Sequence, residues 1–196
     1  MKKREIDVVG FIMGIVIGII FGYLLGTRLH QENTEEVIKD NSKIYGNVYL
    51  LQIMKGNNLT EINNVLNDTS ITYQIISDNG IYYVYAEIDI DETVLENKKE
   101  EYQTMGLNPI IKSQYILDWS EKYNADSQKY DFYNDAIGYF LDDLSGKEIT
   151  IADEYYINPV DLEIFSNINL MKSIKNDEIK LAIQLETYKL LFEKLN

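Results

Sequence analysis

The sequence predicts an α+β protein in three parts: an N-terminal transmembrane helix, a domain with the element order β-α-β-β-α-β, and a C-terminal helical extension. Residues 8–29 form one long apolar run. Residues 46–117 contain short apolar runs, rich in strand-forming residues and separated by turn residues. Residues 118–196 carry apolar residues at helical spacing. We therefore assign residues 1–29 to the N-terminus and membrane helix, 30–45 to a polar linker, 46–117 to the α+β domain and 118–196 to the extension.

The apolar run has no charged residue from Val8 to Gly26. As an α-helix this stretch spans roughly 28 Å, close to the ~30 Å hydrocarbon core of a bilayer. Glycine recurs in it at every fourth position, a spacing that lets membrane helices approach closely. Because the stripe drifts about 40° around the helix at each step, a partner meets only its central part. We expect three glycines to pack against another single-pass envelope protein or a second copy of the chain: Gly14, Gly18 and Gly22.

The charges that flank the apolar run predict its orientation. Lys2, Lys3 and Arg4 precede it, whereas the chain turns acidic soon after Arg28. The positive-inside rule therefore places the N-terminus in the cytoplasm and residues 30–196 outside, in a single-pass protein of a bacterial cell membrane. A cleaved signal peptide is the alternative. The run is longer than the ~7–15 residues of a signal-peptide core, and no A-x-A cleavage pattern follows Gly26, so retention of the helix is favoured.

Composition excludes several classes of function. The chain has 18 basic and 32 acidic residues and a formal net charge of −14, which disfavours nucleic acid and anionic lipid headgroups as main partners. It has no cysteine, and its one histidine, His30, follows the apolar run directly. We therefore expect no enzyme, no cofactor and no metal site. The acidic residues near Asp91 lack the glycine and spacing of a calcium-binding loop, so helix capping explains them more simply.

Turn and cap signals divide residues 46–117 into four strands and two helices. Asn58 can cap the first helix, with Glu61 three residues later as its capping-box partner. Asp78-Asn79-Gly80 is a tight-turn signal that joins two strands in a hairpin. Asp91-Glu92 begins the second helix, and Gly106 ends it. The strands are predicted at residues 48–54, 71–77, 81–90 and 107–116.

The extension is predicted to be helical. Apolar residues from Tyr130 to Leu144 share one face of a helix that Gly146 ends, and Pro159 is the expected first residue of the next helix. A last helix, from about Asn176, has an apolar seam that needs a partner. Packing within the extension or onto the sheet is one reading, and a dimer or another protein is the other. The seam consists of Leu181, Leu185, Tyr188, Phe192 and Leu195.

The order of the elements and several motifs together resemble a SPOR domain, the ferredoxin-like module of bacterial division and sporulation proteins. The first strand reads Tyr49-Leu50-Leu51-Gln52, and the hairpin opens with Asn79-Gly80 before a tyrosine-rich strand. Asp91-Glu92 and Met105-Gly106-Leu107 match the start and end of the second helix. The chain departs from the family where Met54-Lys55, Tyr83 and Glu87-Ile88 stand in place of a small pair, an arginine and a Gly-Pro.

The resemblance implies that an exposed sheet face binds peptidoglycan glycan strands stripped of their stem peptides, as at a septum. By position it assigns this role to Gln52, Lys55, Ile81, Tyr83 and Ile111. Strand alternation adds Tyr85, since it sends residues 82, 84, 86 and 88 to the helix side and residues 81, 83, 85 and 87 outward. The same alternation sends Leu50, Gln52 and Met54 outward on the first strand. Tyrosine rings suit sugar C–H faces, and amides suit sugar hydroxyls.

Two functions follow from these patterns. The first is a membrane-anchored protein that recognises denuded peptidoglycan in division or sporulation. The second is an assembly or scaffold protein whose SPOR-like domain docks a protein partner and no longer binds glycan. The departures from the family and the short linker favour the second, because residues 30–43 of the linker reach no more than about 50 Å when fully extended. The sheet face could also be covered by the C-terminal extension.

Overall fold

The computed structural model describes residues 45–67 and 69–196. The predicted membrane helix, its glycines Gly14, Gly18 and Gly22, and nearly all of the predicted linker lie outside these residues. Within the part that is described, no helix is both long enough and apolar enough to cross a bilayer.

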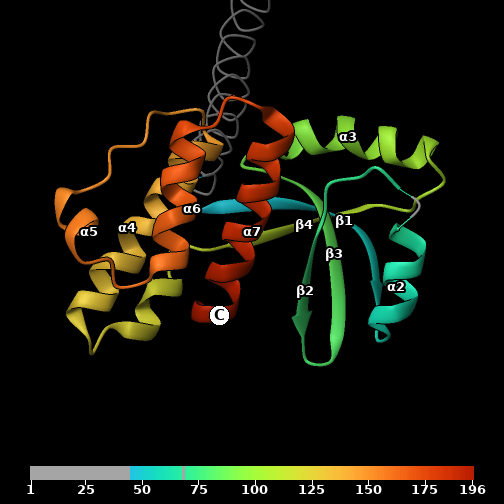
Figure 1. Cartoon of the computed structure of the whole chain (residues 1–196). Helices are drawn as coiled ribbons and strands as arrows, with labels where there is room; N and C mark the ends of the chain where they lie inside the picture. The colour runs from blue at the N-terminus through green and yellow to red at the C-terminus, as the bar shows by residue number, and fades with distance from the viewer. Residues whose placement is uncertain (1–44, 68) are drawn as a thin grey trace, which may run out of the picture. The chain divides into compact units, whose positions relative to one another are not determined.

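Four strands form one antiparallel sheet, which confirms the predicted α+β class. They are β1 (Asn47–Gly56), β2 (Gln74–Asp78), β3 (Ile81–Asp89) and β4 (Ile110–Tyr115). Their order across the sheet is β2-β3-β1-β4, and every neighbouring pair is antiparallel (Figure 1). The hairpin between β2 and β3 turns at Asn79 and Gly80, whose φ angles of 49° and 78° match the predicted tight turn.

Two helices cover one face of the sheet. Both begin at the cap residues that the sequence predicts. In α2 (Leu59–Leu66), the side chain of Asn58 accepts hydrogen bonds from the backbone N–H groups of Thr60 and Glu61. In α3 (Glu92–Thr104), Asp91 accepts one from the N–H of Thr93. Beneath them lies an apolar cluster made of Leu51, Ile53, Ile62, Leu66, Val84, Ala86 and Tyr102.

The chain after β4 is helical. A 3₁₀ helix, η1 (Trp119–Tyr123), precedes α4 (Ser127–Leu144), α5 (Asp153–Ile157), α6 (Leu162–Ser173) and α7 (Asp177–Leu195). The prediction that a helix begins at Pro159 is wrong. Helix α6 begins at Leu162, because Asp161 caps it by accepting hydrogen bonds from the N–H groups of Glu163 and Ile164. The predicted start of the last helix is confirmed, with Asn176 as its N-cap.

Helix α7 packs between the sheet and the other C-terminal helices (Figure 1). The apolar seam of this helix belongs to a cluster that also contains Val48, Leu50, Ile76 and Ile88 of the sheet. Trp119 of η1 contacts the rings of Tyr188 and Phe192, with centroids 5.8 and 5.9 Å apart. The seam therefore finds its partner inside the chain. Leu50, expected on an open face, is instead buried in this cluster.

Ion pairs and hydrogen bonds connect α7 to α4 and to the start of α6. Asp143 of α4 is buried and accepts a hydrogen bond of 2.7 Å from the Gln184 side chain, while its other oxygen lies 2.9 Å from Lys180 Nζ. Asp161, at the start of α6, accepts hydrogen bonds from Lys194 and from the hydroxyl of Tyr133. A buried carboxylate without a partner destabilises the fold. These pairs therefore favour the observed position of α7 against α4 and α6.

Candidate functional site

The register of β1 and β3 brings together most of the predicted binding residues. Gln52 lies opposite Tyr85, and Lys55 lies opposite Tyr83. Directly paired residues share a face of an antiparallel sheet, and alternation along β3 adds Ile81 to the same face. Five of the six predicted sheet residues thus share one surface.

The sixth predicted residue, Ile111, lies on the opposite face. It pairs with Leu51 across β1 and β4, and it packs against the cluster beneath α2 and α3. Met54, also expected to face outward, packs on that cluster too. Ile111 follows its partner Leu51, whereas Met54 is displaced by an irregularity: Gln52 pairs with Tyr85 and Met54 with Val84, so Ile53 is an extra residue in β1. The predicted alternation fails at this bulge.

The shared surface is closed at one end and open at the other. Tyr85 packs edge to face against Tyr188 of α7, with ring centroids 6.4 Å apart and an interplanar angle of 79°. Burial raises the pKa of the Tyr85 hydroxyl to about 12. Gln52 is only 4% exposed. Beyond α7, Lys55 and Ile81 are exposed and Tyr83 is half-buried. Only this second half of the surface is accessible to a ligand.

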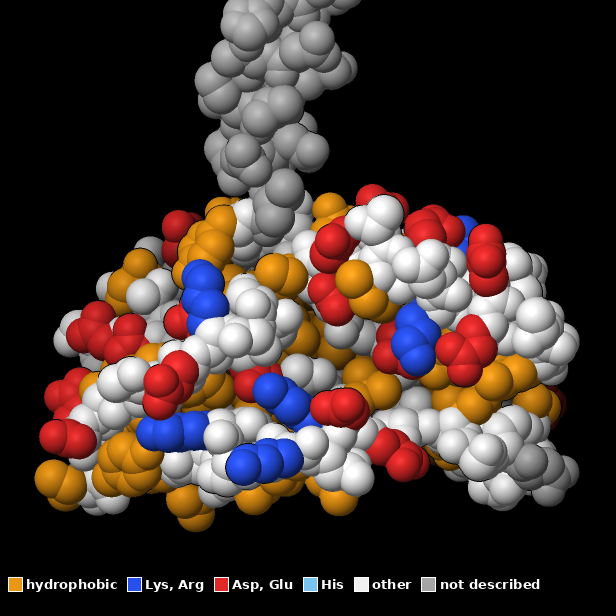
Figure 2. Space-filling view, turned by 90° about the horizontal axis from the view of Figure 1, so that it is seen from above, with side chains coloured by type: hydrophobic (Ala, Val, Ile, Leu, Met, Phe, Trp, Pro, Cys, Tyr) orange, Lys and Arg blue, Asp and Glu red, His pale blue; other side chains and the backbone are white. Residues whose placement is uncertain are grey.

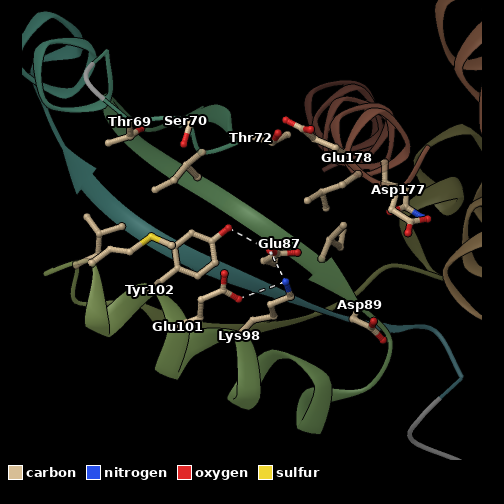
Figure 3. A pocket seen from close by; sticks show the side chains of 16 residues that line it. Thr69, Ser70, Thr72, Glu87, Asp89, Lys98, Glu101, Tyr102, Asp177 and Glu178 are labelled. Carbon is tan, nitrogen blue, oxygen red and sulfur yellow. Dashed lines mark hydrogen bonds and ion pairs between the residues drawn. The ribbon is translucent and has the colours of Figure 1, made fainter.

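A groove of about 800 Å³ opens elsewhere, along the outer edge of β3 (Figure 3). Its walls come from the segment before β2, from α3, and from the first turns of α7. Side chains from these walls and from the end of β3 converge on it (Figure 3). The residues that line it are Thr69, Ser70, Ile71, Thr72, Glu87, Ile88, Asp89, Lys98, Glu101, Tyr102, Met105, Leu107, Asp177, Glu178, Leu181 and Gln184.

The groove exists because β3 is longer than its neighbour. β2 pairs with β3 only between Ile81 and Tyr85. Beyond this point β1 continues to pair with the inner edge of β3, up to Asp89. No strand in residues 45–67 or 69–196 pairs with the outer edge of residues 86–89. The end of β3 therefore borders the groove without a strand partner on this side, although Ala86 and Ile88 are buried.

A half-buried carboxylate lies at the centre of the groove. The side chain of Glu87 is 15% exposed, its Oε1 accepts a hydrogen bond of 3.0 Å from the Tyr102 hydroxyl, and Lys98 Nζ lies 3.8 Å from the same oxygen. Burial raises the pKa of Glu87, although Lys98 and the hydrogen bond from Tyr102 oppose this shift. Burial and the neighbouring Glu87 also raise the pKa of Tyr102.

The groove is strongly acidic. Of the described residues that line it, five are carboxylates and one, Lys98, is basic. Lys98 is already shared between Glu87 and Glu101, at 3.8 and 3.4 Å. Acidic side chains are also spread over the face seen in Figure 2, and the basic side chains among them are scattered. The local potential therefore favours a positively charged ligand.

Strand alternation does not predict the position of Glu87. It places Glu87 outward with Tyr85, but the side chain turns towards α3, where Tyr102 donates to it. A second irregularity is the cause: Leu51 pairs with Glu87 and Gln52 with Tyr85, so Ala86 is an extra residue in β3. One signal in the sequence pointed to an unpaired end of this strand. The third predicted strand, residues 81–90, is longer than the second, residues 71–77.

The nearby acidic residues act as the capping interpretation predicts. Asp91 caps α3, and hydrogen bonds from the hydroxyl and N–H of Thr93 lower its pKa. Asp89 accepts a hydrogen bond of 2.8 Å from the N–H of Asp91. Among the residues that the structure describes, no group of three or more acidic or histidine side chains is arranged to hold a metal ion.

Comparisons of this chain with models of protein families, with curated proteins and with solved structures find no match.

Proposed function

We propose that this chain is a membrane-anchored assembly protein whose ferredoxin-like, SPOR-like domain docks a protein partner outside the cytoplasm and does not recognise glycan. The observation that carries the proposal is the cover that α7 places over the sheet. Tyr85 is packed against Tyr188, and its pair partner Gln52 is buried. Two of the predicted binding residues, Gln52 and Tyr85, are therefore covered by the chain itself.

The topology supports the SPOR-like part of the proposal. Two helices follow β1 and β3 and lie on one face, and the strand order is β2-β3-β1-β4 with antiparallel neighbours. A ferredoxin-like β-α-β-β-α-β module has this arrangement.

The accessible half of the surface fits a protein better than a sugar chain. Carbohydrate recognition needs exposed ring faces and free amides or carboxylates. The amide of Gln52 is enclosed, and the open end combines a flexible cation, Lys55, with the apolar Ile81 and the half-buried ring of Tyr83. Mixed apolar and charged groups of this kind are typical of contact surfaces between proteins.

The sequence supports the proposed location of the domain, outside the cytoplasm and anchored to a membrane. The apolar run at residues 8–29, which has no charge from Val8 to Gly26, would anchor the chain, and the basic residues before it would keep the N-terminus in the cytoplasm. The acidic part that follows is held near the membrane by a short linker, within reach of other single-pass envelope proteins or a second copy.

Retention on peptidoglycan sacculi tests the choice between glycan and protein. The full chain, purified in a non-ionic detergent, is incubated with amidase-treated and with untreated sacculi. We expect equal or absent retention on both. Preferential retention on the treated sacculi, lost in Tyr83→Ala and kept in the control Tyr115→Ala on the far edge strand, would contradict the proposal.

Photo-cross-linking in cells tests the protein partner directly. A photoreactive amino acid in place of Tyr83 is expected to give a discrete protein adduct, because this position lies at the open end of the surface. The same amino acid in place of Tyr115 serves as the control. A lack of any adduct specific to position 83 would count against docking through this surface.

A further inference from the structure

Strand β4 forms one edge of the sheet, and its outer side is open. No strand in residues 45–67 or 69–196 pairs with this side. None of the six residues of β4 is buried, and Lys112, Ser113 and Tyr115 are exposed. An exposed edge strand offers its backbone N–H and C=O groups to another strand.

One hydrogen bond shows which backbone groups of β4 face outward. The N–H of Ile116 donates to the carbonyl oxygen of Gly46, 2.9 Å away, at the start of β1. The N–H of Ile116 therefore points towards β1. Because this direction alternates along an antiparallel strand, the N–H and C=O groups of Ile111, Ser113 and Tyr115 point away from β1, towards the open side.

This outward row is self-complementary. Two copies related by a two-fold axis perpendicular to the sheet pair antiparallel, and residues that lie opposite each other are then both odd or both even in number. An axis at Ser113 pairs Ser113 with itself and Ile111 with Tyr115, so the outward row forms about six backbone hydrogen bonds. An axis at Lys112 would oppose two lysines and use fewer of these groups. Pro109, the next residue on the open side, has no N–H and ends the row.

The side chains at this edge suit a second copy. Residues 107–117 contain no acidic residue and one basic residue, Lys112, in a chain whose formal net charge is −14. Two copies therefore repel each other less along this edge than they would across an acidic surface. In the register about Ser113, Tyr115 of each copy lies opposite Ile111 of the other, and an aromatic ring beside a β-branched side chain is a favourable cross-strand pair.

Lys112 also gains an anionic neighbour in this register. It is exposed and forms no ion pair within the described residues. Across the axis it lies opposite Gln114, whose side chain lines a hollow of about 410 Å³ together with Asp118 and Lys122. Lys122 already contacts the carbonyl oxygen of Asn196 at 3.4 Å, whereas the side chain of Asp118 makes no capping hydrogen bond. Asp118 is thus the carboxylate that Lys112 of the second copy would meet.

We propose that two copies of this chain associate through β4, which pairs antiparallel with β4 of the second copy about Ser113 and joins the two four-stranded sheets into one. The proposal goes beyond the proposed function, because it uses the edge of the sheet opposite to β2 and does not depend on which protein docks around Tyr83.

Single-cysteine variants test the register, because the chain has no cysteine of its own. The full chain in a non-ionic detergent is mildly oxidised, and disulfide-linked dimers are quantified by non-reducing gel electrophoresis. Ser113→Cys is expected to link readily, since directly paired residues lie about 5.5 Å apart between Cα atoms, within the range of a disulfide. In the matched controls Lys112→Cys and Gln114→Cys, the two cysteines lie about 7–8 Å apart on a diagonal, so these variants should link about tenfold more slowly. No dimer from Ser113→Cys, or equal rates at the three positions, would overturn the proposal.

A proline substitution tests the backbone hydrogen bonds. Ser113→Pro removes an N–H that points away from β1, so the fold should persist, which circular dichroism checks. In the purified full chain, an aromatic photoreactive amino acid in place of Tyr115 is expected to give an adduct of twice the chain mass. Ser113→Pro should abolish this adduct, and the control Ser113→Thr should keep it.

Persistence of the dimer adduct in a folded Ser113→Pro variant would contradict pairing through β4. An adduct between two copies at position 115 differs in mass from an adduct with another protein at position 83. The proposed dimer and the proposed docking surface can therefore fail separately.

Discussion

At the scale of single residues, the charged forms of the partly buried carboxylates Glu87 and Asp161 have opposite effects on the stability of the fold. Burial raises the pKa of Glu87, and neither Lys98 nor Tyr102 compensates fully. Burial also acts to raise the pKa of Asp161, but hydrogen bonds from Lys194, Ile164 and Tyr133 lower it below the usual range. The folded state therefore disfavours the charge on Glu87 and favours the charge on Asp161.

Glu87→Gln is expected to stabilise the chain at pH 7. The raised pKa means that the stability linked to Glu87 is fully present below the pKa of an unfolded glutamate and is lost as the pH rises through the folded value. Glutamine is neutral at every pH and can still accept the hydrogen bond from Tyr102. Thermal unfolding should show a higher Tm for the variant at pH 7, and the difference should shrink as the pH falls towards about 4.

Asp161→Asn serves as a control, because it is expected to change the stability at pH 7 in the opposite direction. Its lowered pKa means that Asp161 stabilises the fold above the pKa of an unfolded aspartate, and that this contribution is lost as the pH falls through the folded value. Asparagine keeps the helix cap but not the charge. The variant should therefore melt below the parent chain at pH 7 and approach it in acid. A Glu87→Gln variant that is less stable than the parent at pH 7 would contradict the burial argument.

At the scale of elements, α7 determines which part of the sheet surface is accessible. Its buried residues contact both the sheet and the other C-terminal helices, so its apolar surface extends around more than the predicted seam. Tyr188 is 3% exposed and touches Tyr85, Trp119 and Phe192. This ring joins α7 to β3 through its contact with Tyr85.

Tyr188→Ala is expected to cost about 3–5 kcal/mol of unfolding free energy, because it removes a large ring from a packed cluster. Tyr83→Ala, on the same sheet surface beyond α7, should cost less than about 1 kcal/mol. Urea denaturation monitored by circular dichroism measures both. Similar costs for the two substitutions would mean that α7 does not cover the sheet as described.

At the scale of the whole molecule, the proposed function depends on a membrane anchor that would hold an acidic domain near the bilayer. The whole chain has a formal net charge of −14, which disfavours contact with anionic surfaces. The predicted helix at residues 8–29 would keep the domain near the membrane, and the glycine stripe of this helix would provide a second surface for association.

Gly18→Ile is expected to reduce self-association, or pairing with another single-pass protein, in a membrane two-hybrid assay. The larger side chain would keep the helix backbones apart at the centre of the stripe. Val16→Ile, which enlarges a residue about 200° away around the helix, is the matched control. An unchanged signal in Gly18→Ile would count against pairing through the glycines.

Local signals account for much of what the sequence predicted correctly. Asn58 and Asp91 cap helices as expected, the last helix starts after Asn176 as predicted, and Asn79-Gly80 forms the hairpin turn. These interactions involve residues only a few positions apart, so they depend little on the rest of the fold. The predicted site was only partly recovered, because Ile111 lies on the opposite face and Gln52 and Tyr85 are covered.

The sequence by itself determined the α+β class, the order of the elements in residues 46–117, and the acidic net charge. Only the tertiary structure decided which side chains a partner can reach. The extra residues Ile53 and Ala86 shift the alternation and turn Glu87 towards α3, and α7 returns from the far end of the chain to cover Tyr85. Both effects depend on pairing between distant segments, which no local pattern specifies.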